Sequence, residues 1–334
     1  MNKITQVRIG VDGVSRTLNA IRNYLAREVE DEIRTGLNDK IAHELALADV
    51  PVAEYIRDNL HDLLQADVAH LKAWADYFDL HYPNRFKVKV GKNWRETDLC
   101  KALLAAFDFT KHREGVLVEV AKQLNVKTCP YCNMHYTLYA NEQRARSVRK
   151  LARFQFDHFF EKSKYPMLSM SFYNLIPSCG VCNQGKSAGK LSLDYHPYDS
   201  DIHKLFHFEL RDPLGPYTAA RVKDEVEIEL VPEAGVNAKE FKAYEKMFHL
   251  KALYSRHGDV VQEVYDKAYE APYYLNSANF SFLGTQSIEY LKRLWLGNYT
   301  EAKDIEKRPM AKFMQDLWAQ AEGDATSLIE EGLS

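Results

Sequence analysis

Four of the five cysteines stand in two pairs with the same internal spacing. The pairs are Cys129-Pro-Tyr-Cys132 and Cys179-Gly-Val-Cys182. Each Cys-x-x-Cys turn places two thiolates on one side of the backbone, so two such turns can complete a tetrahedral four-thiolate zinc site. With all four coordination positions filled by protein, the metal has no open position for a substrate. We therefore predict a structural Zn²⁺ site held by Cys129, Cys132, Cys179 and Cys182.

The residues between and just after these pairs are of the types that hydrolysis of a phosphodiester requires. Asp157 and His158 lie in an aromatic run, Asn174 precedes the second pair, and Asn183 follows its last cysteine. The reaction needs a base for water, a Lewis acid for the developing charge and a group that positions the phosphate. His158 is the candidate base, because an unperturbed pKa of about 6.5 leaves an imidazole largely neutral. Asp157 and Asn183 offer oxygen ligands to Mg²⁺ or Mn²⁺.

Two further residues are assigned supporting roles. Asn174 is expected to tie the loop between two strands through side-chain hydrogen bonds and so to orient His158. A helix is expected to open at about Cys182, which places Lys186 on its first turn. Free backbone amides and the ammonium group would there meet a phosphate.

Positive charge is concentrated around the same segment. Residues 126–190 contain ten Lys or Arg against three acidic residues, a local net charge of +7, which leaves −10 for the rest of a chain whose total is −3. A basic centre in an acidic chain suits a site that faces phosphate, with flanks that meet protein partners. Five of these residues, polar where no core is needed, are predicted to contact a nucleic-acid backbone: Arg144, Arg146, Arg149, Lys150 and Arg153.

Hydrophobic periodicity predicts the elements that position these residues. Apolar side chains recur at spacings of three and four over 18–33 and over 56–71, which indicates helices, and Pro51 is expected to open the second. A helix is predicted from Glu96 to Leu124, and the run 86–91 reads as a short strand or an extended loop. Strands are predicted around Asp157 and His158 and over 174–178, each ending near the site.

The sequence pattern after residue 196 predicts a pair of strands and several helices. Residues 205–210 and 226–231 alternate between apolar and polar side chains. Residues 238–271 and 287–333 are helical in pattern, with interruptions near 297–298 and Pro309. The predicted fold class is α+β: a mainly helical framework around a small ββα unit with a four-cysteine zinc knuckle. Its parts are an N-terminal helical region (1–125), the ββα core (126–195) and a C-terminal region that docks a partner (196–334).

Composition restricts the class of protein. A hydrophobic content of 46% and a charged content of 27% are ordinary for a globular chain. No apolar run approaches eighteen residues and the first residues lack a signal-peptide core, so we expect a cytoplasmic protein without a membrane partner. In a reducing cytoplasm, cysteine pairs serve as metal ligands rather than as disulfides. Cys100, outside the pairs, is expected to be a small buried hydrophobe.

The order Asp157-His158, Asn174, Asn183 across strand, strand and helix resembles the HNH nuclease superfamily, whose shared core is the ββα-metal fold. The run Phe-Asp-His-Phe-Phe-Glu-Lys-Ser-Lys-Tyr-Pro at 156–166, continued by 171–179, is similar to PtuB-type HNH proteins. The tail segments at 297–299 and 307–313 resemble their C-terminal region. The resemblance implies a metal-dependent endonuclease of an antiphage system, held in check by an ABC-type, PtuA-like ATPase that senses infection.

Two alternatives remain beside this DNA endonuclease. The same site could cleave RNA, such as a tRNA loop, because the chemistry needs only an accessible phosphodiester and no feature of the sequence reads a 2′-hydroxyl. A third hypothesis is a zinc adaptor that bridges an ATPase and a nucleic acid without cutting. Such an adaptor has no physical need for Asp157, His158, Asn174 and Asn183 together.

Overall fold

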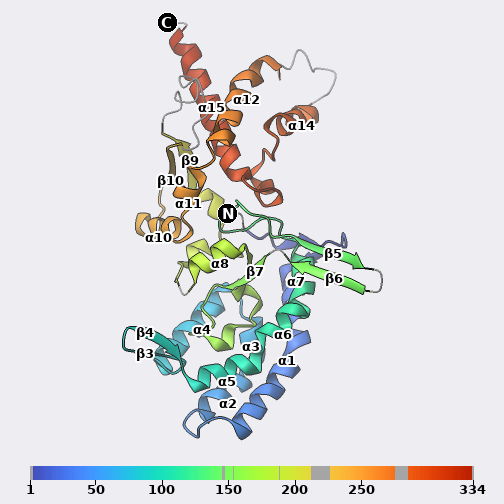
Figure 1. Ribbon diagram of the computed structural model, residues 1–334, viewed down its shortest axis with the longest axis vertical. Coiled ribbons are helices and arrows are strands. Elements are labelled where there is room, and N and C mark those ends of the chain that lie inside the picture. The colour runs from blue at the N-terminus through green and yellow to red at the C-terminus, as the bar shows by residue number, and fades with distance from the viewer. Residues whose placement is uncertain are drawn as a thin grey trace. The chain divides into compact units, whose positions relative to one another are not determined.

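The computed structural model describes residues 3–144, 147–152, 154–187, 189–211, 226–274 and 285–332 (Figure 1). Helices predominate, and the strands among these residues form sheets of two, so the predicted α+β class is confirmed. The chain divides into two compact units. The N-terminal unit consists of Ile4–Val126 and Thr137–Asp199. The C-terminal unit consists of Met1–Lys3, Lys127–Tyr136 and Ser200–Ser334.

The long helix α1 (Leu18–His43) forms the centre of the N-terminal unit's helical framework. Its predicted apolar stripe, from Leu18 to Ile33, is buried. Thr17 caps the helix, because its hydroxyl oxygen accepts a hydrogen bond from the Ala20 amide at 3.1 Å. Packed against α1 are four helices: α2 (Val50–Asp58), α3 (Leu60–Gln65), α5 (Asp98–Phe107) and α7 (Val116–Leu124). The unit also contains α4 (Val68–His81), α6 (Phe109–Glu114) and α8 (Gly180–Lys186).

Two of the predicted helical runs are broken into shorter helices. The residues of the predicted apolar run from Ile56 to Leu71 belong to α2, α3 and α4 rather than to one helix. The run predicted from Glu96 to Leu124 consists of α5, α6 and α7. Its breaks fall at Asp108, which has a left-handed φ of 35°, and at Gly115. These breaks concern the candidate site, because α6 contributes residues to it.

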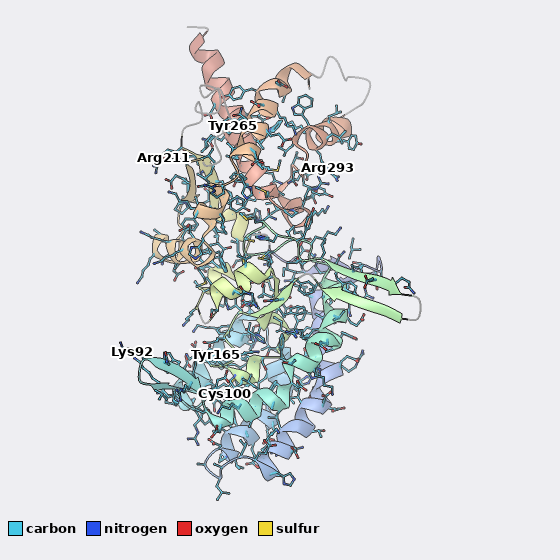
Figure 2. The ribbon with its side chains drawn as sticks, in the orientation of Figure 1. Lys92, Cys100, Tyr165, Arg211, Tyr265 and Arg293 are labelled. Carbon is cyan, nitrogen blue, oxygen red and sulfur yellow. The ribbon has the colours of Figure 1, made fainter. Side chains whose placement is uncertain are left out.

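Four antiparallel strand pairs complete the N-terminal unit. They are β1 (Val7–Ile9) with β2 (Ser15–Thr17), β3 (Lys87–Val90) with β4 (Asn93–Glu96), β5 (Tyr139–Arg144) with β6 (Ser147–Ala152), and β7 (Gln155–His158) with β8 (Leu175–Ser178). The run 86–91 is therefore a strand rather than an extended loop. Cys100 is buried on α5 as expected, and its thiol donates to the Ser163 carbonyl at 3.3 Å (Figure 2).

The C-terminal unit contains the predicted strand pair. Strand β9 (Phe206–Leu210) pairs antiparallel with β10 (Ile228–Pro232), and alternate side chains of β9 are buried. Side chains of helix α15 (Ala311–Gly332) form hydrogen bonds with backbone groups on the other edge of β9. A carboxylate oxygen of Asp316 accepts from the Phe208 amide at 2.9 Å, and Gln320 both accepts from and donates to the backbone of Leu210. The connection predicted at Pro213, Gly215 and Pro216 lies outside the described residues.

The remaining helices of this unit follow the predicted pattern. They are α10 (Ala238–Phe248), α11 (Leu250–Tyr254), α12 (Gly258–Tyr274) and α14 (Thr285–Leu296). The expected interruption occurs at Gly297, which has a φ of 74°. None of the helices in the described part of the chain is long and apolar enough to cross a lipid bilayer.

Candidate functional site

The first cysteine pair sits in a tight turn of the C-terminal unit. The Cys129 amide donates to the His135 carbonyl at 2.9 Å, and the Asn133 amide donates to the Cys129 carbonyl at 2.8 Å. Asn133 has a φ of 53°, a left-handed conformation that asparagine tolerates. The Met134 amide points to Cys132 Sγ at 3.4 Å. The turn thus has a fixed shape that holds both sulfur atoms on one side.

The second pair opens helix α8. Cys179 is the N-cap residue, and its Sγ accepts a hydrogen bond from the Cys182 amide at 3.4 Å. The four Sγ atoms all lie within 4.8 Å of one another, and all four side chains are buried. Tetrahedral zinc with bonds of about 2.3 Å separates its sulfur ligands by about 3.8 Å, so the cluster fits such an ion. The predicted four-cysteine cluster is confirmed as a site that can hold a metal such as Zn²⁺.

A strand pair followed by a helix carries the polar residues predicted for chemistry. Strands β7 and β8 pair with Asp157 opposite Ile176 and His158 opposite Leu175. Helix α8 follows β8 directly and contains Asn183 (Figure 1). Side chains alternate along a strand, so Asp157 and His158 leave opposite faces of β7. Asp157 is buried, whereas His158 is partly exposed.

Asn174 ties together the chain between the two strands, as predicted. Its Oδ1 accepts from the Phe160 amide at 2.7 Å, and its Nδ2 donates to the carbonyls of Phe160 at 3.2 Å and Leu168 at 2.8 Å. The side chain is fully buried. Since Phe160 follows His158 by two residues, these bonds fix the backbone at the end of β7. Asn174 is therefore a positioning residue rather than one that lines the pocket described below.

His158 is held in one orientation by two contacts. Its Nε2 lies 3.0 Å from the Ser169 carbonyl oxygen, and its ring meets the Phe109 ring edge-on at 4.6 Å. A carbonyl only accepts hydrogen bonds, so Nε2 carries the proton and Nδ1 retains a lone pair. Burial, followed by the positive charge of Lys162, lowers the pKa of His158 to about 3. The imidazole is consequently neutral at physiological pH.

Asp157 and Lys186 form a buried ion pair, which corrects the placement expected for Lys186. Helix α8 begins at Gly180 because Cys179 caps it, so Lys186 is its last residue and not part of its first turn. The Lys186 ammonium lies 3.1 Å from Oδ2 and 3.2 Å from Oδ1 of Asp157, and it donates to the His158 carbonyl at 2.7 Å. The Lys186 side chain has no exposed surface and is therefore not available for the predicted phosphate contact.

The ion pair predicts a large coupling free energy. Asp157→Asn or Lys186→Met alone leaves one buried charge uncompensated, which we expect to lower the free energy of unfolding by about 3 to 5 kcal/mol. The double variant should lose much less than the sum, and denaturant unfolding of all four proteins measures this difference. The exposed pair Lys72–Asp76 is the control, with an expected coupling below about 1 kcal/mol. Additive losses at Asp157 and Lys186 would contradict the pairing.

Asp157, His158 and Asn183 line one pocket of about 400 Å³. Two exposed cations that the sequence reasoning did not nominate line it too: Arg113, from α6, and Lys162, which follows β7. The Lys162 ammonium lies 5.3 Å from the centre of the Phe109 ring. No sequence spacing links Arg113 to Asp157, because the helix that carries it precedes the cysteine pairs. Lys162 belonged to the basic segment, but only the pocket distinguishes it from its neighbours.

Three of the basic residues predicted to contact nucleic acid belong to one hairpin. In the antiparallel pair β5–β6, Lys150 stands opposite Asn141, Arg149 opposite Glu142, and Arg144 opposite Ser147. The hairpin brings the backbones of Arg144, Arg149 and Lys150 close together. Arg146 and Arg153 lie outside the described residues. Contact of all five with a nucleic acid stays a prediction.

Comparison of the chain with protein-family models, with curated proteins and with solved structures gives no significant match. The functional interpretation therefore depends on the residues of the pocket and of the cysteine cluster themselves.

Proposed function

We propose that this protein is a metal-dependent endonuclease of the HNH type, in which β7, β8 and α8 are the ββα-metal unit. One observation carries the proposal. Asp157, His158 and Asn183, from the expected strand and helix, line a single pocket together with the exposed cations Arg113 and Lys162. A neutral base, oxygen ligands and positive charge are the groups that phosphodiester hydrolysis needs in one place.

His158 is the proposed general base. Its Nδ1 takes a proton from the attacking water, while the hydrogen bond from Nε2–H to the Ser169 carbonyl keeps the ring oriented. An imidazole with a pKa of about 3 is a weak base in the empty pocket. A bound phosphate is an anion, and an anion beside the ring favours its protonated form. The proton affinity of His158 therefore rises when the substrate is present.

Positive charge in the pocket binds and orients the phosphate. Arg113 and Lys162 are both exposed and approach from different elements, α6 and the segment after β7. Arg113 presents a planar guanidinium that matches two phosphate oxygens, and Lys162 adds a point charge. In this proposal the basic hairpin β5–β6 contacts the nucleic-acid backbone on either side of the scissile bond.

Asp157 and Asn183 would hold the catalytic Mg²⁺ or Mn²⁺, which would neutralise charge that develops on the phosphate. One carboxylate and one amide suit a cation that keeps several waters and binds the substrate phosphate as well. Lys186 already pairs with Asp157, so an ion must compete with that ammonium for the carboxylate. In the same proposal the cysteine cluster holds a structural Zn²⁺, and its four filled positions leave it no part in the reaction.

The wider assignment rests on the resemblance to PtuB-type proteins. Under this assignment, the chain is a cytoplasmic effector of antiphage defence that cuts DNA and works with an ABC-type, PtuA-like ATPase. Cleavage of RNA by the same site, or bridging of the ATPase and nucleic acid by a zinc adaptor that does not cut, are the alternatives. The pocket favours an enzyme, because an adaptor needs no oriented imidazole beside a carboxylate.

The test is a cleavage assay with the purified full chain, alone and with the product of the neighbouring gene, with and without ATP. Plasmid DNA, phage DNA and total tRNA are incubated with Mg²⁺, with Mn²⁺ or with EDTA. We expect plasmid or phage DNA to be cut in the presence of either metal and not with EDTA. Cleavage of tRNA alone would change the substrate to RNA. Binding without cleavage under every condition would replace the enzyme by the adaptor.

A further inference from the structure

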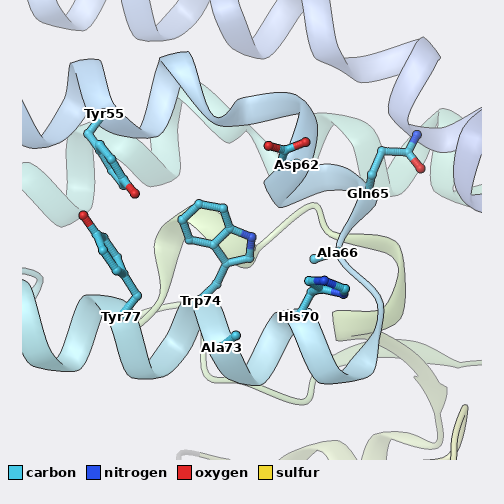
Figure 3. Close-up of a pocket in the computed structure, with 8 residues that line it drawn as sticks. All are labelled: Tyr55, Asp62, Gln65, Ala66, His70, Ala73, Trp74 and Tyr77. Atoms are coloured by element: carbon cyan, nitrogen blue, oxygen red, sulfur yellow. The ribbon is translucent and has the colours of Figure 1, made fainter.

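A second cavity, of about 570 Å³, lies on the N-terminal unit between α2 and α3 on one side and α4 on the other (Figure 3). Six of the side chains that line it are Tyr55, Asp62, Gln65, His70, Trp74 and Tyr77. None of the residues that line the pocket around His158 belongs to this cavity. The proposed nuclease chemistry leaves it without a role.

Three aromatic rings line the cavity, Tyr55 from α2 and both Trp74 and Tyr77 from α4 (Figure 3). The rings of Tyr55 and Tyr77 stack at 5.2 Å with an interplanar angle of 16°. The Trp74 ring stands at 69° to Tyr55 and at 84° to Tyr77, with centroid separations of 6.4 Å and 6.0 Å. All three side chains are partly exposed and line the cavity. Trp74 and Tyr77 are three residues apart on α4, which places them on the same face of that helix.

The α3 side of the cavity carries a carboxylate. Asp62 projects from α3 across the cavity from Trp74 (Figure 3). Within the part of the chain that the structure describes, its side chain makes no hydrogen bond or ion pair. His70, which also lines the cavity, is already paired with Asp67 at 2.8 Å. No lysine or arginine is among the described residues that line the cavity.

The surrounding segment is also acidic. Residues 50–82, which form α2, α3 and α4, contain six acidic residues against two basic ones, a net charge of −4. The two basic residues, Arg57 and Lys72, are paired with Asp58 and Asp76. One of the six acidic residues, Asp79, is paired with Lys164 from outside the segment. The remaining excess of negative charge favours cations over phosphates and carboxylates.

We propose that the cavity binds an organic cation, a guanidinium or alkylammonium group carried on a short apolar stem. The faces of aromatic rings attract cations, and tryptophan does so most strongly. Asp62 supplies the counter-charge, and the apolar stem covers the Tyr55 and Tyr77 rings. A nucleotide would bring phosphates into an acidic surface. A neutral apolar ligand would desolvate Asp62 without pairing it.

Fluorine NMR of the full chain labelled with 5-fluorotryptophan can test this proposal at the site itself. The chain has four tryptophans, so Trp74 gives one resonance of four, which the variant Trp74→Leu assigns. N-acetyl-arginine amide is the probe. N-acetyl-citrulline amide, of the same shape but without charge, is the matched ligand control. We expect the arginine compound to shift the Trp74 resonance saturably and to bind at least about fivefold more tightly than the citrulline compound.

Variants test whether the Asp62 carboxylate contributes to binding. Asp62→Asn should weaken binding of the arginine compound by about fivefold, because it removes the counter-charge and keeps the shape. Asp39→Asn, at an exposed acidic residue of α1, and Trp94→Leu, at an exposed tryptophan of β4, should leave the affinity unchanged. A Trp74 resonance that does not move, or equal binding of the citrulline compound, would overturn the proposal. So would tighter binding of AMP than of the arginine compound.

The cation could come from a free metabolite or from a protein side chain. Agmatine represents the first source, and a Gly-Ser peptide with one central arginine represents the second. The source whose probe binds more tightly is assigned as the ligand, and binding of either supports a cation site. The proposal shares no residue with the proposed nuclease pocket, so loss of cleavage in His158→Ala leaves it untouched.

Discussion

Replacement of His158 with alanine should abolish nucleic-acid cleavage while the protein stays folded and retains its zinc. The imidazole is the only neutral nitrogen base among the residues that line the pocket around Asp157 and Asn183 in the described part of the chain. Loss of a general base typically lowers the rate by about 10² to 10⁴ fold. The cleavage rate of plasmid DNA at saturating Mg²⁺ measures the effect, and the zinc content and thermal midpoint are determined on the same samples.

Two controls make this result specific. His61→Ala alters an exposed histidine of α3 that lines neither the pocket around His158 nor the cavity beside Trp74, and this variant should cleave at the normal rate. Asn174→Ala removes the three hydrogen bonds that hold the end of β7, so it should lower both stability and cleavage. Cleavage by His158→Ala at the normal rate would exclude His158 as the base and leave the zinc assignment intact.

Replacement of Cys129 with serine should release the metal and destabilise the protein. The alternative to a bound ion is a set of four buried thiols crowded within 4.8 Å of one another. Binding of structural Zn²⁺ contributes on the order of 10 kcal/mol to small metal-stabilised folds. We expect zinc content to fall from about one ion per chain to a small fraction, and the thermal midpoint to fall by more than 10 °C, as roughly estimated from this energy.

The fifth cysteine provides the matched control. Cys100 is also buried, but it lies on α5 and its thiol bonds to the Ser163 carbonyl. Cys100→Ser should keep the full zinc content, and any loss of stability should be that of a single core substitution. Elemental analysis and differential scanning calorimetry of both variants give the comparison. Equal zinc content in Cys129→Ser and the unaltered protein would exclude Cys129 as a ligand.

Much of the site could be predicted because the relevant signals are local. Two identical cysteine spacings predict a four-cysteine cluster whatever the rest of the fold, since each short turn sets the direction of its own thiolates. The alternating residues of β9 and the apolar stripe of α1 predict their buried faces for the same reason. The position of Asn174 at the start of the second predicted strand was enough to predict its hydrogen bonds to the connecting loop.

Other features escaped prediction because they depend on a small local difference. The helix expected to open at Cys182 opens at Gly180, since Cys179 acts as the cap, and that shift moves Lys186 from the first turn to the last. In the helical framework, Asp108 has a left-handed backbone conformation and separates α5 from α6. Hydrophobic periodicity shows a continuous apolar run there, so it cannot locate a one-residue break in the helix.

The sequence by itself determined which residue types are available for metal binding and hydrolysis, and which helices and strands hold them. Only the tertiary structure decided which charges meet. It placed Lys186 against Asp157 in the interior, brought Arg113 from α6 to the pocket of His158, and set Asp62 across from Trp74. The physical reason is that periodicity and spacing report contacts within one element. Charge pairing and cavities arise where residues far apart in the chain come together.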